Sequence, residues 1–125
     1  MEGKIFVSNA FSLSMLTSFP ANLRVREVSV EDVKRLLREN SFTSAVGHQA
    51  TADVLTRLLG TQIPFNRVQI QLNEGDVLVV FQLLTRLEEG KVLTEQELSK
   101  LQFKFLLVIN DTPVRVLINR KEKRK

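Results

Sequence analysis

Residues 77–84 read VLVVFQLL, and seven of these eight residues are apolar. Because apolar side chains fall on both alternating faces, this run predicts a central strand that is covered on both sides. Residues 67–72 (RVQIQL) alternate between polar and apolar side chains, which is typical of a half-buried strand. Asn73 to Asp76 separate the two runs with turn-forming residues. We therefore predict that residues 67–72 and 77–84 form a hairpin.

The rest of the chain alternates between strand and helix patterns. Ser29 with Asp32, and Thr94 with Glu97, have the spacing of capping boxes, and Gly60 suits a helix end. With the apolar spacing, these signals predict helices over residues 30–40, 48–59 and 94–101. Further strands are expected at residues 4–9, 23–28 and 103–110, with 42–46 as a brief strand or a connection and 114–118 as an optional last strand. The expected fold is a single-domain α/β protein, in which helices flank a mixed sheet of about five or six strands.

The chain has 125 residues and a net charge of +4, which is unevenly distributed. Six of the 18 basic groups and two of the 14 acidic groups lie in residues 111–125, so residues 1–110 carry 12 of each. Short basic ends are usually solvated and mobile, and a nonspecific phosphate-binding arm is the alternative. We therefore predict a domain over residues 1–110 and a C-terminal extension over 111–125 with a basic, mobile tail.

Composition excludes several chemistries. There is no cysteine, so disulfides, thiolate nucleophiles and cysteine-ligated zinc are ruled out. One histidine and no acidic cluster beyond Glu88-Glu89 predict no metal site, and no phosphate-loop or dinucleotide motif predicts a cofactor. No apolar run approaches the ~18 residues of a membrane span, and the first residues lack a signal-peptide pattern. We expect a cytoplasmic protein with no cofactor, no membrane contact and no protein partner that a motif would indicate.

Polar residues occur at predicted strand ends and at the start of one helix. His48, the only histidine, follows Gly47 at the head of the helix over 48–59. Gln82 interrupts the apolar run 77–84, and Arg86 follows that run. Strand ends and helix N-termini that meet at one edge of a sheet often form a site, and the exposed helix amides attract anions. This pattern favours a phosphate-bearing ligand, although a lone histidine at a helix start is more often structural than catalytic.

Six short motifs occur in a fixed order along residues 4–110. They are SNAFSLSML, SFP, GH followed by Thr51, LGT, NRV and RLEEGKVLT. Each motif alone is weak, but in this order and spacing the chain resembles the viral type III anti-CRISPR ring nucleases. That family occurs in archaeal viruses and has bacterial relatives.

The resemblance implies an enzyme that works as a symmetric homodimer on cyclic tetra-adenylate. The family cuts this ring to linear di-adenylates and so switches off type III CRISPR signalling. The family's catalytic histidine matches His48, and its assisting glutamate matches Glu89 rather than Glu88. The positions that match its substrate contacts are Asn9, Ser12, Gly47, Arg67, Gln82 and Arg86.

Elementary chemistry agrees with what the resemblance implies. An RNA phosphodiester carries its own nucleophile, the ribose 2′-OH, so cleavage needs positioning and a proton donor rather than a metal. His48 is the expected general acid, and Arg67 and Arg86 are expected to stabilise charge on the phosphate. The alternative is a non-catalytic dimeric binder of nucleotide or DNA that uses the same basic groups and the tail. Such a binder would tolerate loss of His48 and depend steeply on salt.

Overall fold

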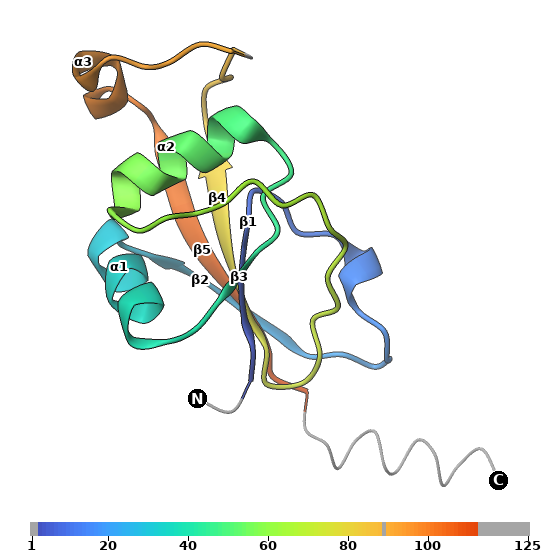
Figure 1. Ribbon diagram of the computed structural model, residues 1–125. Helices are drawn as coiled ribbons and strands as arrows, with labels where there is room; N and C mark the ends of the chain where they lie inside the picture. The colour runs from blue at the N-terminus through green and yellow to red at the C-terminus, as the bar shows by residue number, and fades with distance from the viewer. Residues whose placement is uncertain (1–2, 89, 113–125) are drawn as a thin grey trace, which may run out of the picture.

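The computed structural model describes residues 3–88 and 90–112, which form a five-stranded mixed sheet with helices (Figure 1). The strand order is β2-β5-β4-β1-β3. β4 pairs in parallel with β1 and antiparallel with β5, and β3 runs parallel to β1. In chain order the elements are β1 (Ile5–Ser8), the 3-10 turn η1 (Leu13–Met15), β2 (Leu23–Val28), α1 (Val30–Glu39), β3 (Thr43–Ser44), α2 (Gln49–Leu59), β4 (Val77–Leu83), α3 (Glu95–Ser99) and β5 (Phe103–Asn110). This architecture confirms the α/β class and the mixed sheet.

β4 is the central strand, as its apolar run predicts, but the predicted hairpin is wrong. Residues 67–72 form no strand, and the two neighbours of β4 are β1 and β5. Both hydrogen-bonding edges of β4 are therefore occupied. The alternation in residues 67–72 has another cause, because Ile70 and Leu72 are buried against the sheet while Val68 is exposed. A bond from Leu72 N to Met15 O (2.8 Å) joins this stretch to η1 instead of to a strand.

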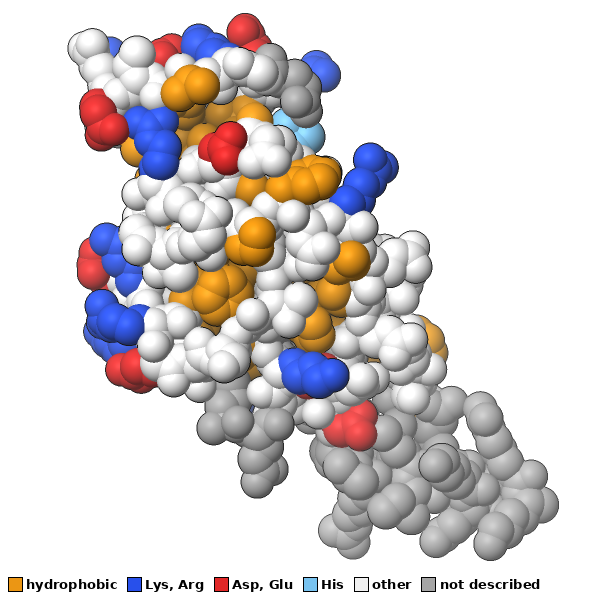
Figure 2. All heavy atoms as spheres, viewed as in Figure 1, with side chains coloured by type: hydrophobic (Ala, Val, Ile, Leu, Met, Phe, Trp, Pro, Cys, Tyr) orange, Lys and Arg blue, Asp and Glu red, His pale blue; other side chains and the backbone are white. Residues whose placement is uncertain are grey.

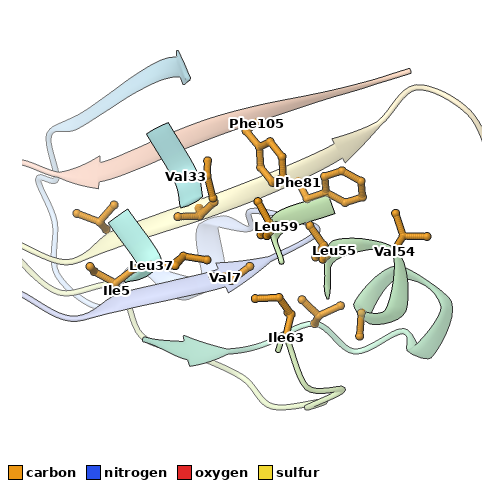
Figure 3. Packing of buried hydrophobic residues seen from close by; sticks show 14 residues of the cluster. Ile5, Val7, Val33, Leu37, Val54, Leu55, Leu59, Ile63, Phe81 and Phe105 are labelled. Carbon is orange, nitrogen blue, oxygen red and sulfur yellow. The ribbon is translucent and has the colours of Figure 1, made fainter. Parts of the chain in front are cut away.

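The core lies on both faces of the sheet. On one face, Phe81 and Phe105 pack with Leu55 of α2 and Val33 of α1, as Figure 3 shows. On the other face, Leu78 and side chains from β1 and β5 are covered by the chain around η1 and by residues 70–72. Each strand residue of β4 from Val77 to Phe81 is buried. A strand that is covered on both faces is apolar at consecutive positions, which explains why VLVVF lacks alternation.

The helix boundaries follow from local signals in the sequence. The predicted capping boxes are present at α1, where Ser29 and Asp32 bond reciprocally, and at α3, where Thr94 and Glu97 do the same. Gly60 ends α2 with a φ of 64°, a left-handed conformation that glycine adopts without steric cost. These three predictions are confirmed.

Asp111 and Thr112, the two residues after β5, are still bonded to the folded domain. Asp111 N donates to Asn22 O (2.8 Å), and the Thr112 hydroxyl accepts from Asn22 N (2.8 Å). Residues 113–125, which include the optional strand 114–118 and most of the predicted basic tail, lie outside the described residues, as does Glu89. None of the helices in the described part of the chain is both long and apolar enough to cross a bilayer.

Candidate functional site

A cleft of about 350 Å³ opens where the parallel strands β1 and β4 end and α2 begins. It is lined by four of the predicted site residues, Asn9, His48, Gln82 and Arg86. The other lining residues are Thr51, Phe81, Leu83, Thr85 and Leu87. The carboxyl ends of parallel strands and a helix N-terminus thus meet at one edge of the sheet, which is the usual place for a ligand site in an open α/β fold.

His48 is the residue before α2, but its side chain does not cap the helix. Its backbone is extended, with φ −142° and ψ 118°, and no side-chain capping bond is formed. The imidazole lines the cleft and is partly exposed, and Figure 2 shows it in pale blue at the surface. The imidazole of His48 therefore does not serve as a side-chain cap for α2. Its Nδ1 lies 3.3 Å from the hydroxyl oxygen of Thr51.

Thr51 belongs to the GH motif of the sequence but was not among the predicted site residues. Its side chain lines the cleft, is only 5% exposed and contacts the imidazole one helical turn after His48. Residues three apart on a helix face the same side, so the spacing of His48 and Thr51 carried this information. The sequence did not predict Thr51 as a cleft residue because Thr51 also fits the apolar face of α2.

Asn9 and Gln82 enter the cleft from two neighbouring strands. Asn9 directly follows β1, and the preceding Ser8 anchors that end through a bond from its hydroxyl to Ala45 O (3.4 Å). Gln82 is the penultimate residue of β4 and is exposed, whereas the five strand residues before it are buried. Gln82 is therefore not a core amide, and its side chain is available to a ligand.

Arg86 lies three residues beyond β4 and is exposed. Within residues 3–88 and 90–112, no hydrogen bond or ion pair engages its guanidinium. An arginine at a cleft, next to a helix N-terminus and with no acidic partner in the described part of the chain, favours an anionic ligand. Two N–H groups of its planar guanidinium can bond two oxygens of one phosphate at the same time.

The remaining predicted residues lie outside the lining of this cleft. Ser12 is exposed and caps η1, where its hydroxyl oxygen accepts from Ser14 N (3.2 Å). Arg67 is exposed and packs against Gly47, where an added Cβ would lie only 3.1 Å from Arg67 Cγ. Gly47 thus leaves room for the Arg67 side chain next to His48. Glu89 is not among the described residues, and in the described ones no three histidine or acidic groups gather as metal ligands.

The fold and the cleft define a class: a small α/β protein with a cleft, lined by a histidine and an arginine, at the carboxyl edge of parallel strands. Residues 5–105 match the STIV B116-like family, and the chain belongs to that family.

Known relatives come from archaeal viruses and from a bacterium. The solved structure of B116 of Sulfolobus turreted icosahedral virus superposes with a TM-score of 0.78 at 35% identity, over 86% of this chain and 100% of that chain. "Uncharacterized protein 26" of a Sulfolobus islandicus filamentous virus is 39% identical over 104 residues, which is 82% of this chain and 88% of the relative. "Uncharacterized protein YddF" of Bacillus subtilis is 29% identical over 101 residues, covering 79% of this chain and 94% of the relative.

Proposed function

We propose that this protein is a metal-independent ring nuclease that cleaves cyclic tetra-adenylate to linear di-adenylates. The cleavage would switch off type III CRISPR signalling. The observation that carries the proposal is the meeting of His48 and Arg86 in one cleft, with the His48 side chain uninvolved in capping α2. A proton donor and a phosphate-binding cation are the two groups that this reaction needs from the protein.

In the proposed step, a ribose 2′-oxygen attacks the adjacent phosphorus and the bond from phosphorus to the 5′-oxygen breaks. The protonated imidazole of His48 gives its proton to the departing 5′-oxygen, while the 2′-hydroxyl proton passes to solvent. The products at each cut are a 2′,3′-cyclic phosphate and a 5′-hydroxyl. A positioned general acid contributes roughly 10²–10⁴ in rate.

The other cleft residues have matching roles in this proposal. Arg86 balances charge on the phosphate, and the amides at the start of α2 add to the positive potential. Asn9 and Gln82 offer amide donors and acceptors that suit ribose hydroxyls and adenine edges. Ser12, Gly47 and Arg67 would contact the ring outside the cleft of this chain, and Glu89 would assist the proton transfer.

The proposal includes a symmetric homodimer. Four identical nucleotides in a ring have a two-fold axis, and an isologous dimer has one as well. Two copies of His48 placed on opposite sides of such a ring would cut it twice and yield two dinucleotides. Each cleft would then act on one half of the ring.

The test is to incubate the protein with labelled cyclic tetra-adenylate in EDTA and to separate the products by chromatography. The proposal expects linear di-adenylate with a 2′,3′-cyclic phosphate end. Ring binding without cleavage would favour a non-catalytic nucleotide-binding protein. Absence of ring binding would reject cyclic tetra-adenylate as the ligand.

A further inference from the structure

Arg57, in the last turn of α2, binds the chain segment that carries Arg86. Its Nη1 donates to Leu93 O (2.6 Å), and its Nη2 donates to a carboxylate oxygen of Glu95 (2.8 Å). The side chain is 28% exposed, so these bonds are partly shielded from water. Figure 1 shows the connection from β4 rising past one end of α2 and returning to α3 near the other end. Arg57 therefore links the α3 end of this connection, at Leu93 and Glu95, to α2.

The cleft-lining part of this connection is held by apolar packing of Leu87 against the core, not by polar contacts among the described residues. Within the described residues, no hydrogen bond or ion pair engages Thr85, Arg86 or Leu87. On the β4 side, the last anchor is the bond from Leu84 N to Gln102 O (2.9 Å). The position of Arg86 therefore depends on the packing of Leu87 and on how both ends of the connection are held.

The far end of the connection is held by a compact set of polar contacts. Lys91 pairs with Glu97 (2.9 Å), and the same glutamate accepts from Thr94 N (3.0 Å) in the capping box of α3. These bonds stiffen residues 91–97 internally, and Leu93 packs against the hydrophobic core. Arg57 adds a polar link to α2, because its partners Leu93 and Glu95 belong to this set.

We infer that Arg57 is a positioning residue for the proposed reaction, and the inference rests on that proposed function. His48 stands at the start of α2 and Arg57 lies nine residues later on the same helix, about 14 Å along its axis. One rigid helix therefore holds the general acid directly and the Arg86-bearing connection through Arg57. The bond to the Leu93 carbonyl matters most, because Glu95 is 90% exposed and a surface ion pair is worth little.

A simpler role for Arg57 is to stabilise α2 through the helix dipole, as any cation in a last turn does. Two variants separate the roles. Arg57→Lys keeps the charge but replaces a planar fork with a single ammonium, which does not reproduce the two-pronged contact. Arg38→Gln is the matched control, because Arg38 is the basic residue in the last turn of α1 and lies away from the cleft lining.

The experiment first measures amide hydrogen exchange without ligand, for wild type, Arg57→Lys, Arg57→Gln and Arg38→Gln. The inference expects faster exchange in peptides spanning residues 84–94 in both Arg57 variants, and wild-type exchange there in Arg38→Gln. Unchanged exchange in the Arg57 variants overturns the inference. This readout does not depend on cleavage, so it stays decisive if the protein does not act on cyclic tetra-adenylate.

The second measurement is a double-mutant cycle. It compares kcat/KM for cyclic tetra-adenylate among wild type, Arg57→Gln, Arg86→Gln and the double variant. Misplacing a binding group by about an ångström costs up to roughly 100-fold, so Arg57→Gln is expected to lose about 10- to 100-fold. Because Arg57 acts through Arg86, adding Arg57→Gln to Arg86→Gln should cost little more. Multiplicative losses in the double variant would overturn the inference, since independent sites are additive in free energy.

Discussion

The hydroxyl oxygen of Thr51 lies 3.3 Å from Nδ1 of His48, one helical turn further along α2. The threonine is buried whereas the histidine is partly exposed, so the contact holds one side of the imidazole against a buried neighbour. A hydrogen bond at one ring nitrogen also determines which tautomer the neutral imidazole adopts.

We predict that Thr51→Val slows cleavage of cyclic tetra-adenylate about tenfold, the rate equivalent of one hydrogen bond of ~1.4 kcal/mol. The measurement is the single-turnover rate at saturating protein. Thr51→Ser keeps the hydroxyl and should retain most of the rate. Equal rates for the serine and valine variants would show that the hydroxyl does not orient His48.

Arg86 is predicted to bind a phosphate of the ring. Arg86→Gln should weaken binding roughly 10- to 100-fold, because a charge-assisted bond is lost. It should also reduce the salt dependence of binding, since one fewer cation meets a phosphate. Arg38→Gln serves as a control for the loss of one positive charge. If both variants bind the ring equally well, Arg86 is not a ligand-contacting residue.

Gly47 is predicted to act through Arg67. An alanine there would bring its Cβ to about 3.1 Å from Arg67 Cγ, so that side chain would have to move by a few tenths of an ångström. Gly47→Ala should therefore lower ring affinity, and combining it with Arg67→Gln should lower affinity no further than Arg67→Gln alone. Binding by calorimetry checks this. An affinity loss that adds fully to that of Arg67→Gln would indicate a direct role for Gly47.

Glu97 gives a prediction for stability in acid. The Thr94 backbone amide and the Lys91 ammonium lower the pKa of Glu97 to about 2, from an ordinary value of 4.5. Because the folded pKa is the lower one, the stabilisation is complete above pH 4.5 and is lost as pH falls through about 2. Glu97→Gln should thus melt below wild type at pH 7, and the gap should close between pH 4.5 and 2. A gap in Tm that is independent of pH would contradict this account.

The fold was largely predictable because its signals are local. Two capping boxes, Gly60 and the run 77–84 each report on a few neighbouring residues, and all four were confirmed. Strand pairing is not local. The stretch 67–72 alternates like a strand, but whether it joins a sheet depends on a free edge of β4, and β1 and β5 occupy both.

The sequence predicted which residues line the cleft better than it predicted where their side chains lie in space. Asn9, His48, Gln82 and Arg86 stand at element ends, and element ends on one edge of a sheet converge in space. Ser12 and Arg67 also stand near the ends of predicted elements, but they lie outside the cleft lining. Both lie in loops, and the path of a loop is hard to predict from its sequence. Thr51 was hidden because a buried threonine on a helix face resembles any other core position.

The most direct test of the central claim compares wild type with His48→Ala in EDTA, with ring binding and single-turnover cleavage of cyclic tetra-adenylate measured on the same samples. If His48 is the general acid, both proteins bind the ring, wild type yields di-adenylate, and His48→Ala cleaves at least about 100-fold more slowly. Equal cleavage by the two proteins, or binding by wild type without any di-adenylate, would contradict it.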